Sequence, residues 1–187
     1  MNLYLVGYRC TGKSSAGRIV SDALGWVFVD MDHELQAEEG RDVQQIVEDQ
    51  GWEYFRQSET NLVQRLSRGS KQVIATGGGV VTNPGNVTLM HGSGKVVWLH
   101  ASPNTIAQRM AADQTTGGQR PPLRGRDSIG EIEDILAERM PLYQQAMHFR
   151  VDTDGLSPEG VAELVLAWLS SVERGVYPVI FLLGTKH

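Results

Sequence analysis

The sequence predicts an α/β protein in which helices cover both faces of a parallel sheet. Two observations support this. Short apolar runs alternate with longer segments of helical period along most of the chain, and the connections between the runs are long enough for right-handed crossovers. A length of 187 residues is that of one domain.

Five short segments have the character of buried strands. Each is rich in Val, Ile or Leu and is bounded by Gly, Asp or Asn, as expected of strands that are covered on both faces. The predicted strands are Leu3–Val6, Val27–Asp30, Val73–Thr76, Val96–His100 and Phe149–Asp152.

Three helices are predicted between these strands from their boundary residues. Lys13–Leu24 stops at Gly25, a residue that favours the position after a helix. Trp52–Leu66 follows a glycine, and Pro103–Ala112 begins with proline, which suits a first helical turn.

Two later helices have start signals of their own. Ser128 and Glu131 form the S-x-x-E pattern of a capping box, followed by an apolar stripe of Ile132, Ile135, Leu136 and Met140. Ser157 and Pro158 open the last helix, whose predicted buried face is Val161, Leu164, Val165, Trp168 and Leu169.

Composition narrows the class of protein. The 17 basic and 22 acidic residues give a net charge of −5, which argues against a general nucleic-acid binder. One cysteine cannot form an internal disulfide, which favours a reducing compartment. The sequence has neither a run of about 18 apolar residues nor the pattern of a signal peptide. We therefore expect a cytoplasmic protein that binds neither nucleic acid nor membrane.

Two segments do not follow the alternation of strand and helix. Residues 114–127, QTTGGQRPPLRGRD, are rich in Gly, Pro and Arg; they predict either a surface loop or a lid that closes over an anion. Residues 172–187 include the apolar run VYPVIFLLG, which is compatible with an edge strand, a partner contact or a flexible end. The sequence leaves both choices open.

A phosphate-binding motif lies between the first predicted strand and the first predicted helix. Residues 7–14, GYRCTGKS, match G-x-x-x-x-G-K-[ST] in the context that distinguishes a Walker A loop from a ligand-free turn. Gly7 and Gly12 let the backbone curl so that its N–H groups face phosphate oxygens. Lys13 is expected to reach the β- and γ-phosphates, and the Ser14 hydroxyl to bind Mg²⁺. The motif predicts a nucleoside-triphosphate site without specifying the reaction.

Two carboxylates follow the second predicted strand. Asp30 and Asp32 are two residues apart, so in extended chain they share a side. Ligands of parallel sheets gather at this end of the strands, where one acid would serve a metal and the other an alcohol. The alternative is that Asp32 only caps a helix beginning near His33.

Three further features have an ordinary and a functional interpretation. Arg56 and Glu59 share a helix face, as a surface ion pair or as part of a site. Residues 77–79, GGG, end the third predicted strand as a hinge or as a ligand-facing backbone. Arg139 is either an ordinary charge near the end of a helix or a residue that binds a ligand.

Taken in order, these landmarks resemble the shikimate kinase family. The chain has a Walker A loop, D-x-D after the second strand, F-R-x-x-E, GGG, R-P near the possible lid and R-x-P-L-Y on a late helix. The resemblance covers about residues 3–168. It implies a P-loop NTPase fold of the nucleoside-monophosphate-kinase type, three layers in α/β/α arrangement, with strand order 2-3-1-4-5. It also implies one domain over residues 1–171, with a substrate-binding helical region at about 31–66 and a lid at about 114–127.

The resemblance also implies the reaction and its residues. ATP, with Mg²⁺, would phosphorylate the 3-hydroxyl of shikimate in the pathway to chorismate and the aromatic amino acids, in an enzyme expected to be a monomer. Lys13, Asp32 and Arg120 are the implied catalytic residues, and Ser14 and Asp30, the latter through water, serve the metal. The implied ATP-binding set is Cys10, Thr11, Gly12, Lys13, Ser14, Ser15, Arg109 and Arg120, with Arg109 beside the adenine. The implied shikimate-binding set is Asp32, Arg56, Gly78, Gly79 and Arg139, and Glu59 would orient Arg56.

The sequence departs from the family pattern at three places. Cys10 stands where the family often has Gly, the possible lid reads RPPLRG instead of RPLL, and the tail is longer. Two other functions remain compatible with a Walker A fold: a kinase of another hydroxylated metabolite such as gluconate, and a nucleotide-binding regulator without activity.

Overall fold

The computed structural model describes residues 1–112 and 129–175. Its five strands form one parallel sheet in the order β2-β3-β1-β4-β5, which confirms the predicted fold class and strand order. The strands are β1 (Asn2–Val6), β2 (Val27–Asp30), β3 (Gln72–Ala75), β4 (Gly94–His100) and β5 (Phe149–Asp152).

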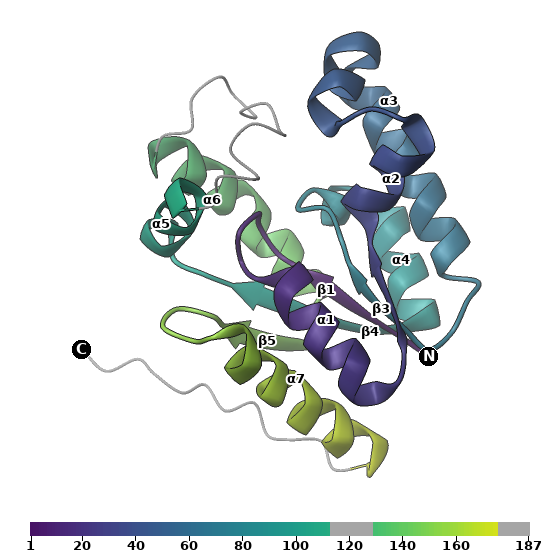
Figure 1. Ribbon diagram of the computed structural model, residues 1–187, viewed down its shortest axis with the longest axis vertical. Helices are drawn as coiled ribbons and strands as arrows, with labels where there is room; N and C mark the ends of the chain where they lie inside the picture. The colour runs from purple at the N-terminus through teal and green to yellow at the C-terminus, as the bar shows by residue number, and fades with distance from the viewer. Residues whose placement is uncertain (113–128, 176–187) are drawn as a thin grey trace.

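Helices connect the strands and form the outer layers (Figure 1). They are α1 (Lys13–Leu24), α2 (Met31–Glu39), α3 (Val43–Leu66), α4 (Pro84–Ser93), α5 (Pro103–Ala112), α6 (Ile129–Ala146) and α7 (Pro158–Glu173), with a short 3-10 helix, η1 (Val80–Thr82). Within the described ranges, no helix has the length and apolar character needed to cross a membrane.

The alternation of side chains along the strands divides the core into two layers. Leu3 and Leu5 of β1 pack with α1 and α7, whereas Tyr4 and Val6 face α3, α4 and α6. Both sets are fully buried, which explains why the strands are continuous apolar runs. The sheet is thereby fixed on both sides, and the loops at the carboxyl ends of its strands are held in place.

Helix boundaries follow the sequence closely where a cap is encoded locally. Gly25 ends α1 in the left-handed conformation, and the Ser157 hydroxyl caps α7 by accepting a hydrogen bond from the Gly160 N–H at 3.2 Å. The prediction that Leu164 belongs to the buried face of α7 is wrong, because this residue is 45% exposed. It lies at the margin of the apolar stripe, turned away from the sheet.

Two helical segments differ from the expectation. α3 begins at Val43 instead of Trp52 and is interrupted at Gly51, whose φ of 84° and ψ of 165° are not helical. α4 was not predicted, because its sequence, PGNVTLMHGS, has two glycines and little amphipathic pattern. Its stability comes from the Asn83 cap and from the buried Met90.

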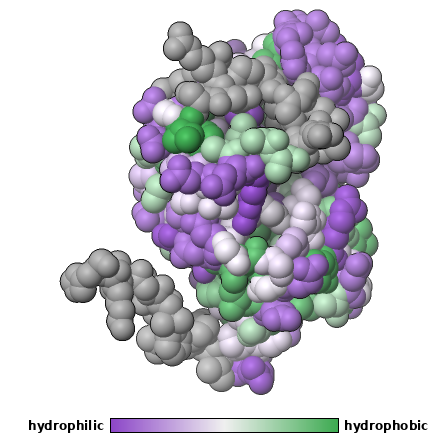
Figure 2. Space-filling view, turned by 60° about the vertical axis from the view of Figure 1, so that its left-hand side comes forward, coloured by the Kyte–Doolittle hydropathy of each residue, from purple (hydrophilic) through white to green (hydrophobic). Residues whose placement is uncertain are grey.

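The helical hairpin of α2 and α3 stands above the sheet. Its tip is covered with hydrophilic side chains at the top of the molecule (Figures 1 and 2). Ion pairs of Arg41 with Glu39 and Asp49, 3.1 and 3.0 Å long, join the two helices there. The lower part of the hairpin faces the loop after β1 and forms one wall of the site.

Candidate active site

The phosphate-binding loop has the conformation that its sequence predicts. Gly12 has a φ of 91° and precedes α1 directly, so the loop runs into the helix N-terminus. Lys13 is 8% exposed, and its ammonium group donates hydrogen bonds to the carbonyls of Gly7 and Tyr8, at 2.9 and 2.7 Å. It is therefore already held over the hollow of the loop.

Two oxygen groups that suit Mg²⁺ lie beside this lysine. The Ser14 hydroxyl donates a 2.5 Å hydrogen bond to Asp30 Oδ2. Mg²⁺ uses hard oxygen ligands, few of them from protein, and completes its shell with phosphates and water. This hydroxyl and carboxylate have the right chemistry for such an ion. Residues 1–112 and 129–175 contain no group of three or more His, Cys, Asp or Glu side chains that could hold a metal.

Cys10 lies in the loop with a φ of 60°, in the left-handed region that side chains disfavour. This geometry explains why glycine suits the position. The same residue's carbonyl accepts a 3.2 Å hydrogen bond from Arg109 of α5.

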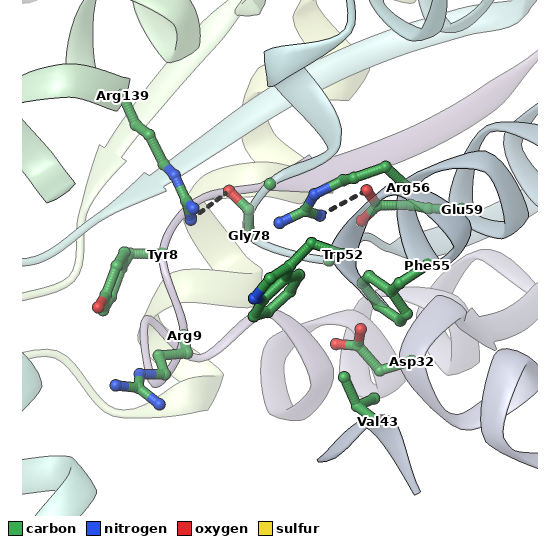
Figure 3. Close-up of a pocket in the computed structure, with 12 residues that line it drawn as sticks. Tyr8, Arg9, Asp32, Val43, Trp52, Phe55, Arg56, Glu59, Gly78 and Arg139 are labelled. Carbon is green, nitrogen blue, oxygen red and sulfur yellow. Dashed lines mark hydrogen bonds and ion pairs between the residues drawn. The ribbon is translucent and has the colours of Figure 1, made fainter. Parts of the chain in front are cut away.

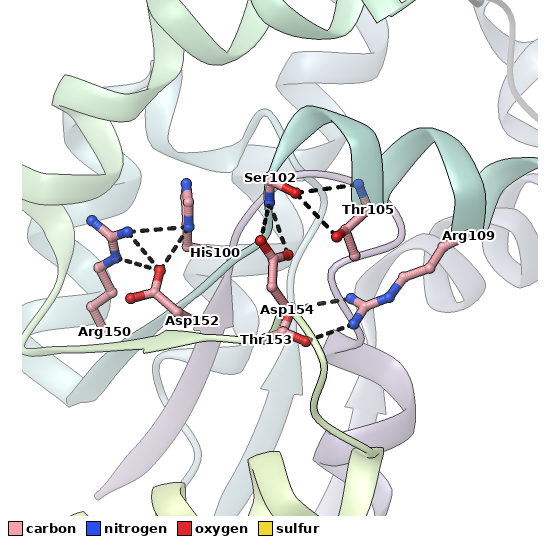
Figure 4. Close-up of polar contacts among 8 residues, drawn as sticks. All are labelled: His100, Ser102, Thr105, Arg109, Arg150, Asp152, Thr153 and Asp154. Atoms are coloured by element: carbon pink, nitrogen blue, oxygen red, sulfur yellow. Dashed lines mark hydrogen bonds and ion pairs between the residues drawn. The ribbon is translucent and has the colours of Figure 1, made fainter. Parts of the chain in front are cut away.

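Arg109 also fixes the loop that follows β5. Its guanidinium group donates to the side chain and the carbonyl of Thr153 at 3.0 and 2.7 Å. Asp154 in turn accepts hydrogen bonds from the Ser102 N–H at the start of α5, at 3.0 and 3.3 Å (Figure 4). Partial burial alone would raise the pKa of Asp154, but these hydrogen bonds, with those of the Thr105 and Ser102 side chains, lower it below its usual value.

A cleft runs along these residues on the nucleotide side. It brings together five of the predicted ATP-binding residues with part of the β5–α7 loop and the start of α7. Its lining is Cys10, Thr11, Gly12, Ser15, Arg109, Thr153, Leu156, Pro158 and Val161.

A second pocket opens on the other side of the phosphate-binding loop (Figure 3). It contains all five predicted shikimate-binding residues and Glu59. The lining comes from the loop after β1, from α2, α3 and α6, and from the segment after β3: Tyr8, Arg9, Asp32, Val43, Trp52, Phe55, Arg56, Glu59, Gly77, Gly78, Gly79 and Arg139.

Arg56 and Glu59 form an ion pair inside this pocket and not on the surface. The Nη1–Oε2 distance is 2.7 Å, and the glutamate side chain is only 2% exposed. Burial raises the pKa of Glu59, although the Arg56 charge opposes the rise. Its other oxygen, Oε1, has no hydrogen-bond partner in the part of the chain that the structure describes. The carboxylate therefore serves mainly to hold the guanidinium group.

The three glycines form the pocket wall between the two arginines. An added Cβ at Gly79 would collide with the Arg56 guanidinium group, and at Gly78 it would lie 3.3 Å from the Gly7 carbonyl oxygen. The Gly78 carbonyl accepts hydrogen bonds from Arg139 at 3.3 Å and from the Tyr143 hydroxyl at 2.5 Å. The absence of side chains thus allows Arg56 to approach Gly79 and the phosphate-binding loop to approach Gly78.

Asp30 and Asp32 differ from the expectation in their geometry. The strand ends at Asp30, so the two carboxylates do not share one side of a strand. Asp30 caps α2 by accepting hydrogen bonds from the N–H groups of Asp32 and His33, at 3.1 and 3.3 Å. The proposed capping role of Asp32 is therefore wrong. Asp30 faces the phosphate-binding loop, whereas Asp32, in the first turn of α2, lines the second pocket.

Several pocket residues were not predicted from the sequence. Trp52 and Phe55 flank Arg56, whose Cζ lies 5.3 and 5.4 Å from their ring centroids. Trp52 is four residues before Arg56, a spacing that could have indicated that the two residues share a helix face. Phe55 directly precedes Arg56, and that position gives no such signal. Arg9, Tyr8 and Val43 carry no signal that distinguishes them from loop or core residues.

Some predicted features lie outside the described residues. These are Arg120 with the possible lid at 114–127, the capping residue Ser128, and residues 176–187 of the tail. The first residues of that tail, 172 and 173, are the end of α7.

The sequence matches known proteins over most of its length. Residues 9–170 match the family model of shikimate kinase. The chain belongs to the shikimate kinase family. A shikimate kinase of Symbiobacterium thermophilum is 39% identical over 175 residues, covering 94% of this chain and 98% of that protein. The chain is thus an ATP-dependent kinase, in a family of enzymes of aromatic amino acid biosynthesis.

Solved structures agree with the assignment to the shikimate kinase family. The shikimate kinase of Acinetobacter baumannii, determined in complex with shikimate, superposes with a TM-score of 0.86 at 31% identity, covering 92% of this chain and 94% of that one. A gluconokinase of Sinorhizobium meliloti reaches a TM-score of 0.57 at 18% identity, covering 94% of this chain and 95% of that one. The second likeness shows a shared fold alone, and the shikimate kinase assignment is favoured over the gluconate alternative.

Proposed function

We propose that this shikimate kinase transfers the γ-phosphoryl group of ATP to the 3-hydroxyl of shikimate with the residue roles that follow. The observation that carries the proposal is the junction at Gly78. The acceptor pocket with its two arginines meets the phosphate-binding loop there, so closely that a Cβ added to Gly78 would lie 3.3 Å from the Gly7 carbonyl oxygen. An acceptor in the pocket therefore adjoins the γ-phosphate position.

Arg56 and Arg139 bind the carboxylate of the acceptor in this proposal. Planar guanidinium groups match planar carboxylates and pair with them through two parallel hydrogen bonds. Glu59 holds Arg56 from behind, and Gly78 and Gly79 leave room for the ligand between the two cations. Trp52 and Phe55 give the pocket an apolar wall against the carbon ring of the substrate.

Asp32 orients the hydroxyl that is phosphorylated and accepts its proton. As the oxygen of that hydroxyl forms a bond to the γ-phosphorus, the bond from phosphorus to the β–γ bridging oxygen breaks and ADP leaves. Such transfers depend on positioning and on stabilisation of charge. Lys13 stabilises the phosphate oxygens from the loop, and we assign Arg120 the same role from the lid side.

The Mg²⁺ ion would be held by the Ser14 hydroxyl and, through water, by Asp30. When bound, it neutralises the β- and γ-phosphate oxygens during transfer. The cleft beside Arg109 takes the nucleoside end of ATP. We further propose that the enzyme is monomeric, that it forms one domain, in keeping with its 187 residues, and that it is cytoplasmic, in keeping with its single cysteine.

ADP release with ATP and Mg²⁺ tests the proposal directly. We expect strong stimulation by shikimate, none by gluconate, and little ATP hydrolysis without acceptor. Equal rates with and without shikimate would contradict the acceptor assignment while leaving the nucleotide site intact. ATP binding without phosphoryl transfer to either alcohol would instead support the alternative of a nucleotide-binding regulator without activity.

A further inference from the structure

Tyr143 donates a hydrogen bond to the same carbonyl oxygen as Arg139, one of the predicted substrate-binding residues. It lies on α6 four residues after Arg139, so the two side chains project from the same face of the helix. Both donate to the Gly78 carbonyl oxygen, the tyrosine at 2.5 Å and the arginine at 3.3 Å. The shorter hydrogen bond thus belongs to the side chain that does not line the pocket.

The tyrosine is rigidly held. It is 0% exposed, and its ring stacks on Trp98 of β4 with centroids 5.7 Å apart and planes at 21°. Trp98 is itself 1% exposed, with the Arg150 guanidinium group 4.8 Å above its ring. The hydroxyl is therefore placed by the sheet, independently of the pocket contents.

The Gly78 carbonyl needs a donor that stays in place. A carboxylate bound by Arg139 would compete with the Gly78 carbonyl for the Nη1 donor, whose hydrogen bond to that carbonyl is already long at 3.3 Å. A buried carbonyl without a donor is costly, and the Gly77–Gly79 segment has no side chains of its own to hold its conformation. Tyr143 supplies the donor that remains.

We propose that Tyr143 is a positioning residue for the acceptor site: its hydroxyl fixes the Gly78 carbonyl and so releases Arg139 to bind the substrate carboxylate. This inference rests on the proposed carboxylate-binding role of the two arginines. It predicts that the tyrosine hydroxyl determines affinity for the acceptor and not for ATP. Burial raises the pKa of Tyr143, so the hydroxyl stays protonated as a donor.

Tyr143→Phe removes only the hydroxyl, and the chain offers a matched control. Tyr4 is also 0% exposed, and its hydroxyl makes a 2.7 Å hydrogen bond with Ser93 Oγ, away from both pockets. Each variant thus loses one buried tyrosine hydroxyl. Comparison of the two separates an effect on the site from a general loss of stability.

Steady-state kinetics for both substrates give the decisive readout. We expect Tyr143→Phe to raise the shikimate KM about three- to tenfold, as for loss of one hydrogen bond, with little change in ATP KM or kcat. Tyr4→Phe should leave both KM values unchanged, although thermal melting should show destabilisation of both variants. An unchanged shikimate KM in Tyr143→Phe would overturn the inference.

Two further variants make the result unambiguous. If Arg139→Ala raises the shikimate KM and Tyr143→Phe does not, the positioning role fails and the proposed function stands; if Arg139→Ala has no effect, the carboxylate assignment itself fails. Should Tyr143→Phe not fold by circular dichroism, Trp98→Phe retains the hydroxyl while reducing the ring area that holds it. For Trp98→Phe we expect a rise in shikimate KM that is smaller than the rise expected for Tyr143→Phe, and no rise in that variant would overturn the inference.

Discussion

The predicted phosphate-binding groups of the nucleotide side come from one continuous segment, residues 7–15, whereas the acceptor pocket is lined by residues from five parts of the chain. In the loop, the Lys13 charge is balanced by the carbonyls of Gly7 and Tyr8. In the pocket, Arg56 depends on a buried glutamate from the same helix, and Arg139 on a carbonyl from another segment.

This difference predicts how the phosphate-binding loop and the acceptor pocket would each respond to a substitution. Lys13 is held by carbonyls of its own loop and does not line the acceptor pocket, so its substitution should alter the chemistry and leave that pocket intact. The pocket depends on contacts between elements, so a substitution there should alter affinity, stability or both. The following predictions test that division.

The largest effect is expected for Lys13→Ala. Loss of a preorganised charge on the phosphates should lower kcat by about 30- to 1,000-fold, while shikimate binding, followed by isothermal titration calorimetry, should stay unchanged. Lys71→Asn is the control: Lys71 is exposed before β3, at the opposite end of the strands, and its φ of 56° suits asparagine. Loss of shikimate binding in Lys13→Ala would contradict the division.

The two pocket arginines should differ from each other. Arg139→Ala should raise the shikimate KM about 10- to 100-fold through loss of a charged hydrogen bond, with an almost unchanged melting temperature. Arg56→Ala should raise that KM too, and it should also lower the free energy of unfolding by about 1–3 kcal/mol, because Glu59 is left buried without its cation.

A double variant checks the cause of that instability. Adding Glu59→Gln to Arg56→Ala removes the buried charge and should restore part of the lost stability, as measured by urea unfolding. No restoration would show that the glutamate charge is not the source of the loss.

A pH effect is expected from a region that belongs to neither half. His148 accepts a hydrogen bond from the Val96 N–H through Nδ1 at 3.1 Å, which requires a neutral ring. Burial, with the nearby Lys95 and His91, lowers its pKa from 6.5 to about 4. The unfolded chain therefore binds a proton before the folded one as pH falls, so stability should be full above pH 6.5 and decline toward pH 4.

Urea unfolding at several pH values measures this effect. His148→Asn keeps an acceptor for the Val96 N–H without a titratable ring, and the decline should be less steep in that variant. The same slope in both proteins would assign the acid sensitivity to other groups.

The smallest effect is expected at Cys10. Glycine would relieve the left-handed conformation but increase the entropy of the unfolded chain, so Cys10→Gly should change stability by less than about 1 kcal/mol. ATP KM should also stay nearly constant, because the carbonyl that Arg109 contacts is retained. Cys10→Val, with a β-branched side chain at the same φ, should lower the melting temperature and raise the ATP KM. Equal behaviour of the two variants would show that the backbone conformation at Cys10 does not matter.

The sequence was sufficient where structure is encoded locally. The strands are apolar runs, Gly25 and Ser157 are caps, and the phosphate-binding loop is a contiguous motif, so each could be predicted without knowledge of distant contacts. The family resemblance supplied the strand order and the residues of the second pocket, which the structure brings together.

Features that depend on tertiary packing could not be predicted in this way. The strand alternation applied to Asp30 and Asp32 fails because a helix begins between them. α4 has no clear pattern and depends on its packing. Val43 and Trp52, which both line the pocket, lie on either side of the interruption of α3 at Gly51, and Tyr143 meets Gly78 across 65 residues of sequence.

The place of Gly78 has a consequence for how a new acceptor specificity could evolve on this scaffold. A methyl group there would press on the phosphate-binding loop, and its carbonyl already serves two donors from α6. Mutation at this position would therefore harm both substrates at once. Selection for a different alcohol has more freedom at Val43, Trp52 and Phe55, which line the pocket from α3.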